Sequence, residues 1–258
     1  MKEFFAAAGK ANFHTHTVWC DGKNTPREMI EGAIERGFDA LGFSSHVSGT
    51  DRSDTVCPME RIADYAAEIR ALEREYAGRI TIKLGIEADY IPGIAVPDVS
   101  EYAFINPDYV IGSIHYVIAE DGGRVPVDHA PELLAEGIAR HFGGSAEAFI
   151  KQYFRQERDM VAMFDFDVVG HPDLVRKFNI KAPYFDENAP WYREEVVKTA
   201  AAIAKSGKIS EINSGAISRG WRTDVYPDDF FRNELDKRGV FLIHSADAHS
   251  VNGLDFWQ

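Results

Sequence analysis

Seven short runs of apolar and β-branched residues alternate with amphipathic, helix-like segments along this chain. Parallel strands need a long crossover between them, usually a helix, so this alternation favours a parallel α/β fold. The last run ends close to residue 258, which leaves no room for an eighth strand and helix. We therefore expect a single domain, residues 1–258, folded as an incomplete or distorted seven-stranded (β/α)7 barrel. The expected strands cover residues 11–17, 39–45, 80–86, 109–114, 166–170, 208–213 and 240–244.

The segments between these runs carry helix signals. The helix expected at residues 26–37 begins with Pro, and Thr25 and Glu28 can form a capping box at its start. Residues 119–144 break the rhythm, because they are rich in Gly, Asp and Pro and contain only a short helical piece at 131–141. Long excursions after a barrel strand commonly carry specificity, so this insertion is expected to wall an active site. Further helices are expected at 59–76, 145–163, 191–205 and 228–238.

Histidine and carboxylate residues stand at or just beyond the ends of most of these apolar runs. In a β/α barrel such positions converge on one mouth, at the C-terminal ends of the strands. Two pairs are closely spaced: His14 and His16 lie on the same face of a strand, and Asp247 and His249 follow the last run. The candidate metal ligands are His14, His16, Asp21, His46, Glu87, His115, His171, Asp247 and His249.

Imidazole and carboxylate groups are the usual ligands of Zn, Mn and Fe. Nine ligands are too many for one tetrahedral ion, so we expect two or three divalent metal ions (Zn, Mn or Fe) close together. Clustered ions of this kind are typical of phosphoester chemistry. The residue types leave the identity of the metal open.

The remaining histidines and the two cysteines have simpler interpretations. His244 lies inside an apolar run and is expected to be a hydrogen-bonded core or near-site residue. His129 and His141 are expected at the solvent-exposed surface, and the alternative for either is a position that faces the substrate. Cys20 and Cys57 are expected to be free thiols. The position of Cys20 beside an aspartate leaves metal ligation open as an alternative.

Several basic residues follow strand ends rather than lying on helix faces. Arg219, Arg222 and Lys177 are candidate substrate-binding residues, because a guanidinium fork or an ammonium group suits phosphate oxygens. We favour Arg219 as the phosphate contact. The alternative for each, and for Arg176, is a surface salt bridge.

The charge of the chain limits its partners. Its formal net charge is −13, which disfavours a nucleic-acid surface but allows an anionic small molecule at bound metal ions. There is no apolar run of membrane-spanning length, and the short apolar stretch at the N-terminus contains Glu3, unlike a signal peptide. We expect a cytoplasmic protein with a small-molecule substrate and no nucleic-acid or membrane partner. The oligomeric state is left open.

The nine candidate ligands occur in an order that resembles the order of the metal ligands in the polymerase and histidinol phosphatase superfamily, known as PHP. Residues 13–22, Phe-His-Thr-His-Thr-Val-Trp-Cys-Asp-Gly, resemble its first motif, and residues 112–116, Gly-Ser-Ile-His-Tyr, resemble its fourth-strand motif. The chain is most similar to the histidinol phosphatase branch, through residues 125–129, 170–179 and 211–223. It departs from the pattern at Ala246, where Ser is expected before the Asp, and in the short segment after His249.

This resemblance implies a distorted seven-stranded barrel that holds three metal ions and hydrolyses L-histidinol phosphate to L-histidinol and phosphate. A hydroxide that bridges the ions would attack phosphorus in line. Acidic residues of the insertion, including Asp128, Glu120 and Asp121, could attract the amine of the substrate. One ion is expected at His14, His16, Glu87 and Asp247, a second at Glu87, His115 and His171, and a third at Asp21, His46 and His249.

Among these ligands, Glu87, Asp247 and His249 are also expected to take part in catalysis. Two other functions fit the same residue types. The site could belong to a PHP-type phosphoesterase that acts on a nucleotide or phosphodiester, or to an amidohydrolase-like C–N hydrolase. A purely structural metal site is disfavoured, because such sites are usually closed sets of four ligands.

Overall fold

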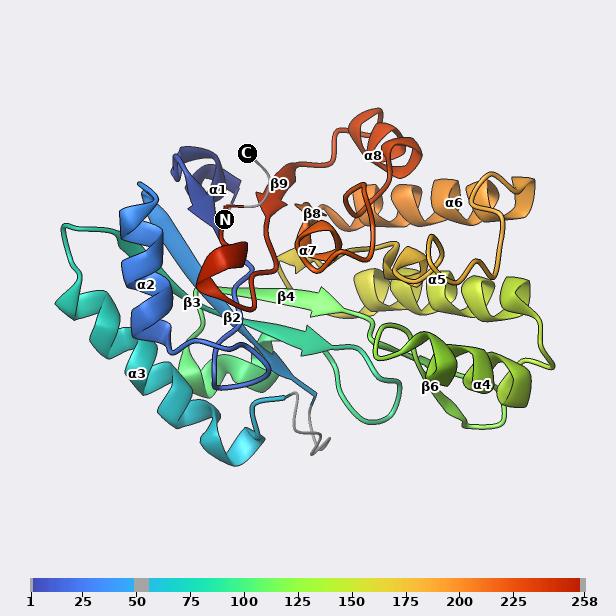
Figure 1. The fold of residues 1–258 in the computed structure, drawn as a ribbon, viewed down its shortest axis with the longest axis horizontal. Helices are drawn as coiled ribbons and strands as arrows, with labels where there is room; N and C mark the ends of the chain where they lie inside the picture. The colour runs from blue at the N-terminus through green and yellow to red at the C-terminus, as the bar shows by residue number, and fades with distance from the viewer. Residues whose placement is uncertain (1, 49–55, 256–258) are drawn as a thin grey trace.

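Seven parallel strands form a nearly closed barrel in the computed structural model, which describes residues 2–48 and 56–255. The strands follow one another around the sheet in chain order, β1-β2-β3-β4-β7-β8-β9, and the predicted α/β barrel is confirmed (Figure 1). Their bounds are β1 Ala11–Asn12, β2 Ala40–Val47, β3 Thr81–Asp89, β4 Tyr109–Ser113, β7 Val168–Val169, β8 Ile209–Asn213 and β9 Leu242–Ser245.

Helices cover the outside of the barrel, with α2 and α3 on one side and α5, α6 and α8 on the other (Figure 1). In the described ranges, no helix is both long enough and apolar enough to cross a membrane. The longer helices are α2 Pro26–Glu35, α3 Ile62–Glu75, α4 Pro131–His141, α5 Ala146–Met163, α6 Pro190–Ser206 and α8 Asp229–Asp236. The short helical segments are α1 Lys2–Ala7, η1 Met59–Arg61, η2 Val99–Ile105, η3 Leu174–Arg176, α7 Gly215–Ser218 and η4 Val251–Gly253.

The start of α2 confirms the predicted capping box. The Thr25 hydroxyl accepts a hydrogen bond from the Glu28 backbone N–H, and the Glu28 carboxylate accepts one from the Thr25 N–H at 2.8 Å. Two of the backbone donors left free at a helix start are satisfied in this way. The cap therefore sets where the helix begins after the long loop that follows β1.

β1 is much shorter than the strand predicted at residues 11–17. The side chain of Asn12 bonds to the backbone of the next residues: its Oδ1 accepts from His14 N at 3.2 Å, and its Nδ2 donates to His14 O at 3.1 Å. These side-chain bonds compete with the sheet ladder and end it early. His14 and His16 still turn their rings toward the same region, with ring centroids 5.1 Å apart.

The seam between the first and last strands closes near the mouth of the barrel. Thr15 forms an isolated parallel bridge with Ala248; Ala248 O accepts from His16 N at 2.9 Å, and Ala248 N donates to His14 O at 3.0 Å. At the opposite end, Phe5 of α1 packs with Phe13 and Tyr109 inside the barrel. A pocket lined by residues of α1, β1 and β9 remains beside the seam at this end.

The insertion at residues 119–144 builds a small subdomain at the mouth. Two strands, β5 Tyr116–Ile118 and β6 Arg124–Pro126, pair antiparallel, and α4 follows with the predicted bounds. Ile118 is tied to α5, because its backbone N–H donates to Gln156 Oε1 at 2.7 Å. This anchor fixes the hairpin beside the ends of the barrel strands.

Candidate metal centre

All nine predicted ligands lie together at the mouth of the barrel. Their imidazole nitrogens and carboxylate oxygens form four overlapping groups in which all ligand atoms lie within 4.8 Å of one another. The groups are His16, Asp21, His46 and His249; His14, His171 and Asp247; His14, His16 and Glu87; and His46, Glu87 and His115. The parallel strand directions explain the convergence, because the C-terminal ends of all seven strands face this mouth.

Glu87 lies near the C-terminal end of β3, at the mouth of the barrel, and is at the centre of these groups. Its Oε2 is 3.0 Å from His14 Nε2, 3.0 Å from His46 Nδ1 and 3.4 Å from His16 Nε2. The side chain is only 1% exposed. One oxygen of this carboxylate therefore faces three imidazole nitrogens.

The second oxygen of Glu87 faces a different set. Its Oε1 is 3.1 Å from His171 Nε2 and 3.6 Å from His115 Nε2, and it accepts a hydrogen bond from Ser113 Oγ at 2.6 Å. The two oxygens thus point to separate groups of histidines. A carboxylate in this position has the geometry to bridge two cations.

Asp21 and Asp247 flank the other side of the centre. His16 Nε2 lies 3.3 Å from Asp247 Oδ1, and His249 Nε2 lies 3.2 Å from Asp21 Oδ2. The His16 ring is stacked between those of His46 and His249, with centroids 4.2 Å away on each side. Asp247 adopts φ +48°, a left-handed conformation that Asp tolerates better than most residues, and this strained position is typical of functional sites.

The expected division of the nine ligands into three sets stays a prediction. The third set, Asp21, His46 and His249, forms one group, which His16 joins. His171, however, groups with His14 and Asp247, whereas His115 groups with His46 and Glu87. The placement of His171 depends on the loop after β7, whose direction strand periodicity does not predict.

The electrostatics of the centre suit a cation. Among the residues that the structure describes, the buried His16 Nε2 has no hydrogen-bond partner, although carboxylate oxygens lie nearby. Burial, helped by His249 and His46, lowers the pKa of His16 to about 3, so this ring is neutral. Burial alone would raise the pKa of Glu87, but the surrounding histidines outweigh it and hold that pKa well below its usual value. Carboxylate oxygens and imidazole nitrogens gathered in this way are the donor set of a divalent metal ion.

Two further carboxylates contact the histidines from behind, and neither was predicted from the sequence as a site residue. Asp89 Oδ1 is 2.5 Å from His115 Nδ1, and Glu211 Oε2 is 2.8 Å from His14 Nδ1. Both carboxylates are nearly fully buried. Asp89 could have been found, because it follows Glu87 at i+2 and so shares its strand face. Glu211 could have been noticed as a charged residue within the apolar run at 208–213.

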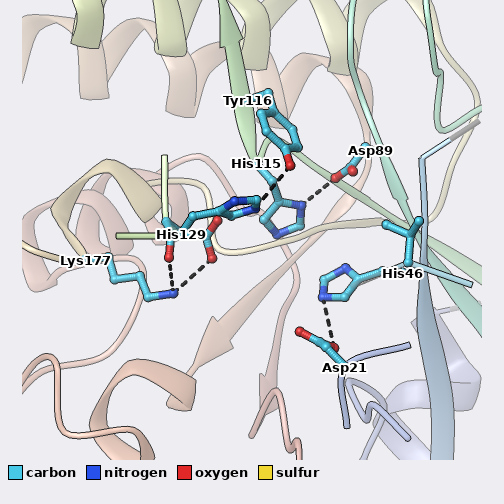
Figure 2. Close-up of a pocket in the computed structure, with 9 residues that line it drawn as sticks. Asp21, His46, Asp89, His115, Tyr116, His129 and Lys177 are labelled. Carbon is cyan, nitrogen blue, oxygen red and sulfur yellow. Dashed lines mark hydrogen bonds and ion pairs between the residues drawn. The ribbon is translucent and has the colours of Figure 1, made fainter. Parts of the chain in front are cut away.

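A pocket of about 280 Å³ opens beside the centre. Lys177, Tyr116 and His129 form one wall, opposite Asp21 and His46 (Figure 2). The predicted role of the insertion as a wall is confirmed, because Asp128 and His129 belong to it. The complete lining is Asp21, His46, Val56, Asp89, His115, Tyr116, Asp128, His129 and Lys177.

The three predicted substrate-binding residues occupy different environments. Arg219 lies against the centre, where its guanidinium donates to Asp247 Oδ2 at 2.9 Å and to His249 Nδ1 at 2.9 Å. Lys177 lines the pocket, and its Nζ donates to Asp128 Oδ2 at 2.9 Å. Neither Arg219 nor Arg222 belongs to this pocket lining.

Arg222 instead belongs to a buried ion-pair network. Its guanidinium donates to Glu187 Oε1 at 3.0 Å, to Asp224 Oδ1 at 2.8 Å and to the Arg176 carbonyl at 2.6 Å. Arg176 joins the same network through Glu187 at 2.8 Å, with only 2% of its surface exposed. Arg176 and Arg222 therefore form salt bridges, which is the alternative to phosphate binding. These salt bridges are buried and not at the surface.

The remaining histidines and the cysteines are also placed. His244 is exposed on β9, so the expectation of a core or near-site position was wrong; the short β9 turns this side chain outward. His129 is exposed, as expected, but it also lines the pocket and hydrogen-bonds with Tyr116 Oη at 3.1 Å. His141 ends α4, with its Nδ1 2.9 Å from Asp121 Oδ2. Cys20 and Cys57 are free thiols, and Cys20 Sγ lies 3.5 Å from His16 Nδ1.

Several proteins that are similar to this chain over most of its length are named as histidinol-phosphatases. A Deinococcus radiodurans protein named "Probable histidinol-phosphatase" is 30% identical over 96% of this chain and 89% of its own length. The histidinol-phosphatase of Bacillus subtilis is 27% identical over 96% of both chains. The likeness therefore spans nearly the whole of each protein.

Solved structures share the fold. A Listeria monocytogenes protein described as a histidinol phosphatase superposes with a TM-score of 0.82 at 21% identity, over 95% of this chain and 97% of that one. The histidinol phosphate phosphatase of Lactococcus lactis, solved with Zn, L-histidinol and phosphate, gives a TM-score of 0.62 at 22% identity, over 94% of this chain and 87% of that one. The family model of the PHP domain matches residues 12–215. The chain therefore belongs to the PHP domain family.

Proposed function

We propose that this chain is a metal-dependent phosphatase that hydrolyses a small phosphomonoester, with L-histidinol phosphate as its substrate, and that residues 1–258 act as one PHP-type domain. The observation that carries the proposal is the convergence of nine histidine and carboxylate side chains around the buried Glu87 beside a small polar pocket. The names of the full-length relatives support the choice of substrate.

Two or three divalent ions fit the nine ligands. Bound there, they would polarise the phosphoryl group and activate a water molecule as the nucleophile. Glu87 holds the two halves of the ligand set together, because its two oxygens face different histidines. Asp247 and His249 complete the set on the side where Arg219 lies.

The chain's own basic groups would position the phosphate. Arg219 is held by Asp247 and His249, which fixes its guanidinium beside the ligand set. Lys177 Nζ donates to the Asp128 carbonyl and carboxylate, so its ammonium is fixed at the pocket wall. Fixed cationic donors stabilise the negative charge that develops on the transferred phosphoryl group.

The organic part of the substrate would occupy the pocket. Tyr116 and His129 offer aromatic faces there, and Asp128 offers a carboxylate to a cationic group. A pocket of about 280 Å³ suits a small monoester and not a nucleic-acid strand.

A screen of the purified, metal-reconstituted protein over phosphorylated metabolites, with histidinol phosphate included, tests the proposal. We expect histidinol phosphate to be the best substrate. Glu87→Gln should keep the fold but lose at least about two orders of magnitude in rate, because an amide cannot carry charge to both sides of the centre. Preference for a nucleotide, a phosphodiester or an amide would refute the substrate assignment, and near wild-type activity of Glu87→Gln would refute the bridging role.

A further inference from the structure

The imidazole of His14 is held at both ring nitrogens by buried carboxylates. Its Nδ1 lies 2.8 Å from Glu211 Oε2, and its Nε2 lies 3.0 Å from Glu87 Oε2. An ionised carboxylate only accepts hydrogen bonds, so Nδ1 next to Glu211 must carry a proton. Nε2 faces Glu87 in the same way, so both nitrogens would donate in a ring without a cation. A cation bound beside Glu87 would replace the proton on Nε2 and leave the proton on Nδ1, which Glu211 accepts.

Glu211 is itself fixed by three other donors. Its Oε2 also accepts from Ser245 Oγ at 2.5 Å, and its Oε1 accepts from the His171 backbone N–H at 2.7 Å and from Asn213 Nδ2 at 2.8 Å. These donors come from β8, β9 and the loop after β7. The carboxylate is fully buried and lies on the side of His14 that faces away from Glu87. Hydrogen bonds occupy both of its oxygens. Glu211 can therefore orient a ligand, but it is not placed to be one.

The same arrangement occurs at a second histidine. Asp89 Oδ1 lies 2.5 Å from His115 Nδ1, while His115 Nε2 faces Glu87 Oε1 at 3.6 Å. Asp89 also accepts from the Ser48 hydroxyl. A carboxylate behind a metal-facing imidazole fixes its tautomer and ring direction and makes the free nitrogen a better ligand. The repetition at two histidines separates this feature from a chance contact.

We propose that Glu211 is a positioning residue of the centre: it holds the proton on His14 Nδ1, so that Nε2 is the nitrogen that would bind a metal ion beside Glu87. Through Ser245 and the His171 backbone, Glu211 also ties the ends of three strands to that ligand. The inference rests on the proposed metal centre, and it predicts a defect in metal affinity that exists apart from catalysis.

The test compares metal binding by Glu211→Gln and wild type, with Zn²⁺ titrated against a chromophoric chelator. In Glu211→Gln the amide has one acceptor oxygen and one NH2 group. The NH2 group takes the place of one carboxylate oxygen and therefore faces the donors from which that oxygen accepted hydrogen bonds. We expect the affinity of the His14 site to fall about 10- to 100-fold, the usual cost of losing such an outer partner. The matched control is Glu195→Gln, which removes a buried carboxylate that pairs with Arg158, outside the nine-ligand groups, and should leave affinity unchanged.

A spectroscopic readout distinguishes positioning from general damage to the fold. In the Zn-loaded wild type, ¹⁵N NMR of labelled histidine should show His14 protonated at Nδ1 and metal-bound at Nε2; the signal is assigned with His14→Asn. In Glu211→Gln that Nδ1 proton should exchange faster or be lost. Unchanged tautomer and unchanged affinity would overturn the role of Glu211.

A second substitution covers the case in which Glu211→Gln does not fold. Glu211→Asp keeps the charge but withdraws the carboxylate by about 1.5 Å, one C–C bond. Weakened binding in a folded Asp variant supports positioning, whereas full affinity would show that charge alone matters and would overturn the proposal. If the wild type itself binds no divalent metal, the proposed function fails; if it binds normally and both variants match it, only the role of Glu211 fails.

Discussion

Glu157, on α5, is a fully buried carboxyl group, and its oxygens have no hydrogen-bond partner among the residues that the structure describes. Burial, and secondarily the nearby Asp173, raise the pKa of Glu157 well above its usual value. Burial also raises the pKa values of Tyr153 and Tyr192, two tyrosines of this region. The folded protein therefore holds Glu157 as a neutral acid.

The burial of Glu157 makes the free energy of unfolding depend on pH. Above pH 4.5 the unfolded chain releases the Glu157 proton while the folded chain keeps it, so the folded state loses stability as pH rises toward the folded pKa. The loss is about 1.4 kcal/mol for each pH unit in that window. Glu157→Gln is neutral at every pH and removes the loss. The variant should match wild type near pH 4.5 and exceed it by an amount that grows by about 1.4 kcal/mol per unit above that.

Urea denaturation of both proteins at pH 5, 6, 7 and 8, at the same metal content, measures this difference. Each kcal/mol of stability that Glu157→Gln gains would also correspond to a rise of about 2–4 °C in Tm for a chain of this size. Glu194→Gln is the control, because Glu194 is exposed on α6 and pairs with Lys198, so it should show no gain that grows with pH. A stability difference that does not change with pH would refute the neutral, buried state of Glu157.

Three further predictions concern the proposed centre. Arg219→Ala should lower turnover by about two orders of magnitude and weaken inhibition by inorganic phosphate, and Arg219→Lys should not restore full activity; unchanged phosphate inhibition would remove Arg219 from the site. Chelation should abolish activity and lower Tm by about 10 °C if the ions were present at about 1,000 times their Kd; an unchanged Tm would argue against tightly bound ions. Histidinol phosphate should be hydrolysed with far higher kcat/KM than an aryl phosphate, and cleavage of DNA or RNA would contradict the assignment of the pocket to a small monoester.

The sequence carried local information well. Thr25 and Glu28 predicted the start of α2, because a capping box needs only residues three positions apart. Residues 131–141 were predicted as a helix with the bounds that α4 has. β1 was predicted too long, because the hydrogen bonds of the Asn12 side chain to the backbone two residues later do not appear in an apolar pattern.

Chain order and strand periodicity by themselves determined which side chains gather at the mouth. A parallel barrel directs the C-terminal ends of all strands to one side, so His16, Glu87 and Asp247 had to meet once each strand was recognised. Only the tertiary structure decided which partner each side chain has there. In the fold, Arg222 lies in a buried ion-pair network with Glu187, and Glu211 lies against His14, which is 197 residues away in the sequence. Such contacts depend on strand register, loop direction and side-chain rotamer together, and residues distant in sequence carry no local pattern that predicts them.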